Sequence, residues 1–394
     1  MKQNERFGTL DSMRGLAALS VMIGHFFLVF PSLAQNTAKL GYMKSPVNMI
    51  KYSPLHIFWA GHEAVILFFL LSGFVLSLPF LNSTSSSYGI YLVKRICRIY
   101  IPYLCAVFIA IVVKQIFFNA PLQQVSSYFQ SQWTAVTELK SILAHVFFLG
   151  NFNSTLYDPI LWSLVHEMRI SIIFPLLMIV VVRGGWKGSL LTCALLTLMA
   201  EVLLRLLDPP YMTNFVATIQ YAAFFIVGAL LAKYRNEIKT YYDKLSRLSK
   251  YILASAAILL YTFHWLFYTQ SYHVYFQYFR EDWIIALGAC LFIVMALNSV
   301  AAKKALLHPV SVYLGKISYS LYLFHFVVLL SLLHLLRGYF SIYIILVMAF
   351  ILSFVCATAG YYWIELPAIR LGKRMVRPRH LHGSDVSSSN NNGI

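Results

Sequence analysis

The chain has few charged residues for its length. Of its 394 residues, 11% are Asp, Glu, Lys or Arg, whereas 59% are hydrophobic, and the mean hydropathy is +0.70. A soluble globular domain carries about 25% charged residues. The composition therefore excludes an ordinary soluble enzyme and predicts an integral membrane protein that crosses the bilayer several times.

Several common sequence signals are also missing. The five cysteines lie in or beside apolar segments and form no Cys-x-x-Cys or Cys/His cluster. We therefore expect small buried thiols, with no disulfide and no metal site. We find no Gly-rich phosphate loop, no internal repeat and no second domain. The opening MKQNERFGTL is not followed by an apolar run with a small-residue cleavage site, so we expect an uncleaved first span and no removable signal peptide.

Long apolar runs are abundant. A membrane-spanning helix needs about 17–25 mostly apolar residues. Runs of this kind predict an all-α fold with about ten transmembrane helices, and ten spans place both termini on the same side. The predicted spans lie near residues 10–30, 63–80, 99–118, 160–182, 188–207, 214–232, 250–267, 283–299, 312–336 and 339–363.

Acidic residues are scarce, with 14 against 31 basic ones and a formal net charge of +17. In the ten-span topology most basic residues fall on the side of the two termini. Cytoplasmic loops carry such an excess of Lys and Arg, so we expect both termini in the cytoplasm and no nucleic-acid partner. Residues 1–379 form one predicted membrane domain, and the polar tail 380–394 is expected to be disordered.

The longest predicted loops, 31–62 and 119–159, then face the outside. They contain Pro, Tyr, Trp and Asn, a composition that suits a lid or a surface for a polar substrate. The apolar stretch 142–149 is too short to span a bilayer. We expect it to lie at the interface or to re-enter the membrane.

The first run, LDSMRGLAALSVMIGHFFLVF, carries Arg14 and His25. They are eleven residues apart, which is about three helical turns or roughly 16 Å on one face. Ionisable side chains inside a span usually face the bundle interior or a water-filled cavity. The two residues predict a polar track through the protein. The alternative is an arginine that reaches the headgroups and a histidine hydrogen-bonded to a neighbouring helix.

The segment YLVKRICRIYIPYL contains Arg95 and Arg98. Three residues apart on a helix, they would share a face. Guanidinium groups bind phosphates through a planar fork of donors, so the pair predicts a site for a phosphorylated anion at the cytoplasmic side. The alternative is that the two arginines only anchor this segment at the cytoplasmic surface of the membrane, as the positive-inside rule describes.

The fourth run opens with LWSLVHEMRISIIFP, which holds two polar pairs at helical spacing. Ser163 and Glu167 are four residues apart, as are Trp162 and His166. A carboxylate near a histidine can orient it and stabilise its protonated form. Glu167 is therefore our candidate for this role.

Other polar residues mark the second and ninth runs. His62 begins the second run on its outer side, and Ser72 precedes a glycine within it, where a helix or a ligand can approach closely. The ninth run contains Tyr319 and His325. Tyr319 also fits an ordinary aromatic belt residue, whereas His325 lies deeper. We treat these four residues, together with Trp162 and Ser163, as candidates for substrate binding or support.

Six segments occur in a characteristic order from about residue 10 to 370. They are LDSMRGLAALSVMIGHF, FFLLSGFVLSLPF, KRICRIYIPY, LWSLVHEMRISIIFP, ISYSLYLFH and WIELP. In this respect the chain resembles the acyltransferase-3 family of integral-membrane acyltransferases. The resemblance implies transfer of an acyl group, usually acetyl from acetyl-CoA, to hydroxyls of carbohydrates handled at the bacterial inner membrane.

The family features Arg-x10-His and Arg-x-x-Arg fall on Arg14 with His25 and on Arg95 with Arg98. The resemblance implies acyl-CoA as a donor co-substrate, with no bound cofactor. Some members carry a fused extracytoplasmic esterase-like domain. We see none here, so we expect transfer to be completed within the membrane domain or with a separate partner.

The expected mechanism uses His25 as general base on the acceptor hydroxyl, with a covalent acyl-histidine as the alternative. Arg95 and Arg98 would hold the CoA phosphates, and Arg14 would guide the thioester. O-antigen of lipopolysaccharide, capsule, exopolysaccharide, a lipid-linked oligosaccharide and a small antibiotic all suit the scaffold as acceptors. A proton-coupled transporter or flippase is the competing class, and a membrane sensor or scaffold the third. The oligomeric state stays open, with a homo-oligomer among the options.

Overall fold

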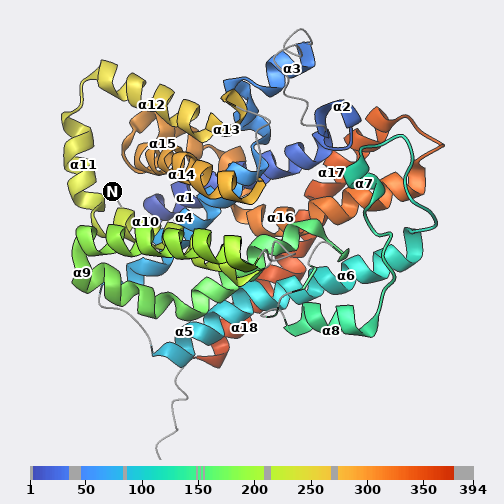
Figure 1. Ribbon diagram of the computed structural model, residues 1–394, viewed down its shortest axis with the longest axis horizontal. Helices are drawn as coiled ribbons and strands as arrows, with labels where there is room; N and C mark the ends of the chain where they lie inside the picture. Colours follow the sequence, from blue (N-terminus) through green and yellow to red (C-terminus); the bar gives the residue numbers. More distant parts are fainter. Residues whose placement is uncertain are drawn as a thin grey trace, which may run out of the picture.

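The computed structural model describes residues 3–34, 46–82, 87–147, 150, 152–153, 156–207, 214–267 and 274–376. In these residues the regular structure is helical, apart from one isolated bridge between Arg337 and Phe340. Figure 1 shows the helices gathered into one bundle. The all-α fold class is confirmed, and the polar tail 380–394 lies outside the described residues.

The helices follow the predicted apolar runs. The long ones are α1 (Gln3–Phe27), α4 (Gly61–Leu81), α6 (Ile101–Phe117), α9 (Trp162–Leu207), α10 (Phe215–Lys233), α14 (Val274–Asn298), α16 (Pro309–Leu336) and α17 (Ile342–Gly360). Shorter ones connect them: α2 (Pro31–Ala34), α3 (Pro46–Lys51), α5 (Tyr88–Arg95), α7 (Ser127–Gln130), α8 (Leu139–Phe147), α11 (Arg235–Lys244), α12 (Arg247–Tyr261), α13 (Phe263–Leu266), α15 (Val300–Leu306) and α18 (Leu366–Met375). Two 3₁₀ turns, η2 (Pro54–Trp59) and η5 (Pro159–Leu161), precede α4 and α9.

Seven helical segments of the described chain are long and apolar enough to cross a membrane. They are Gly61–Leu81, Tyr88–Phe117, Pro159–Leu207, Phe215–Lys233, Phe279–Asn298, Pro309–Leu336 and Ile342–Met375. The number differs from the ten predicted runs for physical reasons. Gly185 breaks α9 with φ 60° and ψ −162°, so this one segment covers two predicted runs. The run at 10–30 carries Asp11, Arg14 and His25, and the run at 250–267 gives a helix of only 15 residues.

Helices α1 and α16 run parallel in close contact. Gly8 faces Leu307, Gly15 faces Gly315, and His25 contacts His325 further along both helices. A Cβ atom on Gly15 would lie 2.4 Å from the backbone nitrogen of Gly315, so only glycine allows this approach. Small residues bring membrane helices together in this way. The glycine contact sets the register that joins the two histidines.

A second tight packing joins α4 to α10. A Cβ atom on Gly73 would lie 2.1 Å from the Phe225 carbonyl oxygen, and one on Gly228 would lie 2.0 Å from the Leu70 carbonyl oxygen. Helix α10 also contacts both halves of α9, which Figure 1 draws as two green helices joined at one end. Helix α4 is thereby held against α9, where Glu167 lies.

Two π-helical turns interrupt the long helices at one end of the bundle. Turn η3 (Ile96–Tyr100) lies between α5 and α6, and η6 (Tyr361–Glu365) lies between α17 and α18. Turn η3 packs on α18, and turn η6 packs on α6. Such turns widen a helix locally and are frequent at functional sites. Here they bring Arg98 and Glu365 within electrostatic reach of each other.

The loop predicted at 119–159 packs against the end of α1. The backbone N–H of Ser126 donates to the Val29 carbonyl over 2.9 Å, and Phe129 and Trp133 are buried. The stretch predicted at 142–149 falls largely in α8, whose Leu143 and Phe147 side chains are exposed. An apolar exposed face fits the predicted position at the membrane interface.

Candidate functional site

Two histidines from distant parts of the sequence meet inside the bundle. Nδ1 of His25 lies 3.0 Å from Nε2 of His325, and the ring centroids are 5.2 Å apart. The His325 ring belongs to α16 and is fully buried, whereas His25 keeps part of its surface accessible. The parallel packing of α1 on α16 therefore gives His25 a fixed partner.

The backbone determines where the protons of this pair lie. Nδ1 of His325 is 2.9 Å from the Leu321 carbonyl, which can only accept, so this nitrogen carries a proton. In the neutral ring, Nε2 of His325 then has a lone pair and accepts from Nδ1–H of His25. The lone pair of His25 is consequently on Nε2. This tautomer presents a basic nitrogen away from His325.

Aromatic side chains cover the pair. The Phe326 ring lies edge-on to His25 with centroids 5.0 Å apart, and the Phe129 ring of α7 stacks on Phe326 at 5.4 Å. Tyr128 also contacts Phe326, at 6.1 Å. The loop that packs on the end of α1 thus supplies part of the apolar surroundings of His25, which limit access of water.

A cluster of arginines and carboxylates lies near the start of α1. Arg14 pairs with Asp11 at 3.6 Å, and its side chain is 16% exposed. The charges of Arg98, Glu167 and Arg95 also act on Arg14. The structure therefore gathers the three predicted arginines around one region of the bundle.

The two arginines of the Arg-x-x-Arg feature have different surroundings. Arg95 is 12% exposed and donates to Glu167 over 3.4 Å and to Ser171 over 3.1 Å. Arg98 lies in the π turn and is exposed. The π turn separates the environments of two side chains that a regular α-helix would place on one face. Arg95 is held by the protein, whereas Arg98 is accessible to an anion.

Glu167 links three helices. It accepts a hydrogen bond from the Ser72 hydroxyl at 3.0 Å and pairs with Arg95. The hydrogen bonds of Glu167 thus run to α4 and α5, and the side chain that contacts His25 is His325. The role of Glu167 beside His25 stays a prediction.

Polar residues of α16 connect the arginine cluster to the histidine pair. The hydroxyl of Ser320 donates to Glu365 over 2.9 Å, and the hydroxyl of Tyr319 donates to the Ile99 carbonyl in η3 over 2.9 Å. One turn further, the Tyr322 hydroxyl lies 2.7 Å from the Ser163 hydroxyl. The α16 helix therefore carries a series of polar groups toward His325.

Two other predicted residues lie in separate contacts. Trp162 packs its ring against His166 at 5.9 Å between centroids. Nε2 of His62 lies 2.6 Å from the carboxylate of Asp282, which is 1% exposed. This second pair joins α4 to α14. It lies just after Gly61, which packs near Gly24, the residue before His25.

Sequence reasoning missed the roles of three acidic residues. It did not single out Asp158 or Asp282, and it did not indicate that Glu365 contacts the site. Asp158 is fully buried before Pro159, and burial raises the pKa of its carboxyl well above the usual range. The signal for Asp158 was present, since Asp before Pro is a typical start of a helix. The partners of Asp282 and Glu365 come from distant segments, which no local pattern indicates.

No group of three or more His, Cys, Asp or Glu residues is arranged to hold a metal ion in the part of the chain that the structure describes. Comparison of the chain with curated proteins and with solved structures gave no match. A family model described as an acyltransferase domain matches residues 7–365 and so includes every candidate residue named above. The chain belongs to the acyltransferase-3 family.

Proposed function

We propose that this membrane acyltransferase moves an acyl group, acetyl in the first instance, from cytoplasmic acyl-CoA to a hydroxyl of an exported or cell-surface carbohydrate. The observation that carries the proposal is the hydrogen-bonded chain from the Leu321 carbonyl through His325 to His25. This chain leaves the lone pair of His25 on Nε2, and His25 is the histidine of the Arg-x10-His feature. A buried base with a fixed tautomer suits deprotonation of a hydroxyl.

The reaction needs one proton transfer in each direction. Nε2 of His25 takes the proton of the acceptor hydroxyl while the oxygen attacks the thioester carbonyl carbon. The tetrahedral oxyanion then expels the CoA thiolate, which receives the proton from the imidazolium. Arg14 is the proposed donor to the thioester oxygen or the pantetheine end, because a guanidinium stabilises developing negative charge. A covalent acyl-histidine on the same nitrogen is the second route.

The arginine cluster supports a donor site. CoA carries several phosphate groups, and guanidinium groups bind phosphate with paired hydrogen bonds. Arg98 is exposed and lies beside Arg14, so it is the proposed direct phosphate ligand. Arg95 is held by Glu167 and Ser171, so we assign it and Glu167 to positioning the site.

The acceptor would approach from the opposite end of α1, over the loop that covers Phe326 and the region of His62. Ser163 and Trp162 are proposed to support this path. Ser72 and Tyr319 contact Glu167 and the Ile99 carbonyl at the donor end, so they are proposed to support the donor site. With both termini in the cytoplasm of a bacterial inner membrane, a donor inside the cell would serve a substrate outside it. The acceptors consistent with this arrangement are O-antigen, capsule and exopolysaccharide.

Donor binding is tested with Arg98→Gln in purified protein, with acyl-CoA and acceptor varied separately. We expect the KM for acyl-CoA to rise about tenfold, as for loss of one charge-assisted hydrogen bond, with little change in the KM for acceptor. Lys94→Gln is the matched control, since Lys94 is also exposed and lies one turn earlier. Equal effects of the two variants would favour plain membrane anchoring.

A proton-coupled transporter remains the competing class, because intramembrane Arg, Glu and His residues also suit proton relays. Purified protein in detergent separates the two classes, since transport needs a sealed membrane and acyl transfer does not. We expect release of free CoA that depends on the acceptor. Absence of turnover in detergent, together with substrate uptake in proteoliposomes, would contradict the acyltransferase proposal.

A further inference from the structure

A long groove follows one face of α6 and does not include the residues assigned to acyl transfer. Two cavities of about 520 and 470 Å³ share Trp363 and Ile364 in η6. On α6 the first contains Ile101 and Cys105, and the second contains Ile109, Val113 and Phe117. These five α6 residues follow one another at intervals of four, so they form one stripe along the helix. The two cavities therefore continue into each other.

The second cavity is apolar and lies within the membrane-spanning segments. Helices α16 and α17 form its other walls, from Phe324 to Leu335 and from Leu352 to Gly360. Its polar exception, Ser331, donates its hydroxyl hydrogen to the Val327 carbonyl of its own helix. The span from Phe324 to Leu335 is about 16 Å long. The whole α6 stripe, from Ile101 to Phe117, is about 24 Å long. One leaflet of the hydrocarbon core measures about 15 Å, so a lipid chain that starts beside Ile101 reaches past Ile109 into the second cavity.

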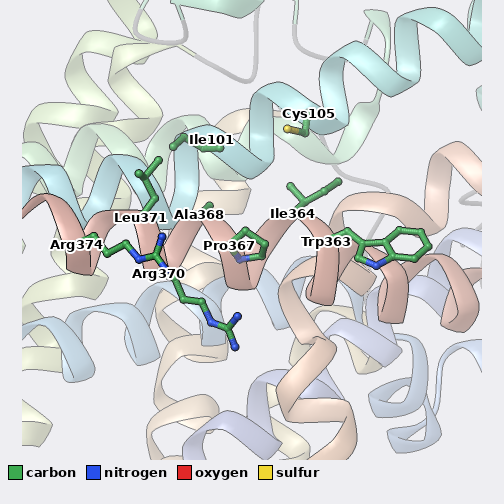
Figure 2. Close-up of a pocket in the computed structure, with 9 residues that line it drawn as sticks. All are labelled: Ile101, Cys105, Trp363, Ile364, Pro367, Ala368, Arg370, Leu371 and Arg374. Carbon is green, nitrogen blue, oxygen red and sulfur yellow. The ribbon is translucent and has the colours of Figure 1, made fainter.

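The first cavity adds a basic end to this groove. Figure 2 shows Arg370 and Arg374 at one end and Trp363 at the other. The two arginines are four residues apart on α18 and both are exposed. Neither takes part in the ion pairs found among the described residues. Guanidinium groups at headgroup level attract phosphate, and Trp is typical of the membrane interface.

We propose that this groove binds a membrane phospholipid with an anionic headgroup. The headgroup phosphate is bound by Arg370 and Arg374, and one acyl chain lies along the α6 stripe between α16 and α17. Charge complementarity at the basic end, and the apolar groove that continues from it, identify this occupant. The site is independent of the proposed acyl transfer. One of its walls is Phe324, directly before His325 on α16.

The headgroup contact is tested with full-length protein in neutral detergent, titrated with fluorescent phosphatidylglycerol. The double variant Arg370→Gln/Arg374→Gln should bind it roughly 30-fold more weakly, given the usual contribution of two basic residues at a membrane surface. Lys373 lies on the same helix but outside the cavity. We expect Lys373→Gln to lose much less affinity than the double variant.

The chain contact is tested separately with Cys356→Phe, which places a ring in the second cavity. We expect weaker lipid binding than in Val355→Phe, where the neighbouring, exposed residue lies outside the cavity. Equal lipid binding by these two variants would contradict the proposed site for the lipid chain. So would equally tight binding of zwitterionic phosphatidylcholine, or a double arginine variant that keeps its lipid and instead loses affinity for acyl-CoA.

Discussion

The reactivity of His25 depends on which of its ring nitrogens carries the proton. The Leu321 carbonyl fixes the proton on Nδ1 of His325, and His325 in turn accepts from His25. A carboxylate would hold the same nitrogen but would also stabilise the charged imidazolium. A neutral histidine orients a base without that charge. In the proposed mechanism, His25 would therefore return its proton to the departing thiolate more readily.

His325 is therefore expected to act as a positioning residue. His325→Ala should lower kcat about tenfold to a hundredfold and leave the KM for acyl-CoA nearly unchanged, because the donor site lies elsewhere. His325→Gln can place an amide oxygen near the lost Nε2 and should recover part of kcat. The measurement is steady-state kinetics with a pH profile. Equal losses in the two variants would contradict the hydrogen-bonding role of His325.

His56 predicts a pH dependence of stability. Its Nδ1 lies 3.0 Å from the Lys51 carbonyl, and its ring stacks on Trp265 at 3.9 Å between centroids. Burial lowers the pKa of His56 to about 3 from the usual 6.5, and the charges of His264 and Lys51 also lower it. As the pH falls, His56 binds a proton in the unfolded chain before it does so in the folded protein. The contribution of neutral His56 to the free energy of unfolding is therefore fully present above pH 6.5 and is lost as the pH falls toward 3.

Thermal unfolding in detergent at pH 7.5 and pH 5 measures this contribution. The wild type should lose up to about 1.4 kcal/mol per pH unit from this one group below pH 6.5. His56→Gln should flatten the dependence of stability on pH below 6.5. The control is His308→Gln, which changes an exposed histidine and should leave this dependence unaltered. A profile for His56→Gln as steep as the wild type would assign the acid sensitivity to other groups.

At the scale of helices, the contact between α1 and α16 places the histidine pair. Gly15→Ala would put a methyl group 2.4 Å from the backbone of Gly315, and overpacking of this kind costs about 1–3 kcal/mol. We expect a lower Tm and a loss of activity. Gly89→Ala in α5 is the control, because a Cβ atom there meets nothing within 4 Å. A Gly15→Ala protein with wild-type Tm and turnover would contradict the close packing.

The helices were largely predictable from the sequence, since each apolar run falls on a helix and Arg14 and His25 share one. Local patterns could not indicate partners that depend on packing. His325 was a candidate on its own, but its contact with His25 depends on the register that Gly15 and Gly315 set, 300 residues apart. The π turn after Arg95 was also hidden, because Arg-x-x-Arg has the spacing of a regular helix. That turn gave Arg95 and Arg98 different environments.

At the scale of the whole molecule, the two functional regions lie at different depths. The arginine cluster gathers near the start of α1, and His25 lies about 16 Å further along the same helix. A donor bound by its phosphates at one end can therefore present its thioester to a base deeper in the bundle. In the proposed orientation, CoA stays on the cytoplasmic side while the acyl group reaches an exported hydroxyl.

The most direct test of the central claim is acyl transfer by the purified chain and its His25→Gln variant at equal, folded concentration. The assay follows radiolabelled acetyl from acetyl-CoA to a soluble carbohydrate acceptor. We expect acceptor-dependent labelling by the wild type and a loss of about 10²–10⁴-fold in the variant, the usual contribution of a general base. Labelling by His25→Gln at the wild-type rate would contradict the assignment of His25 as the base.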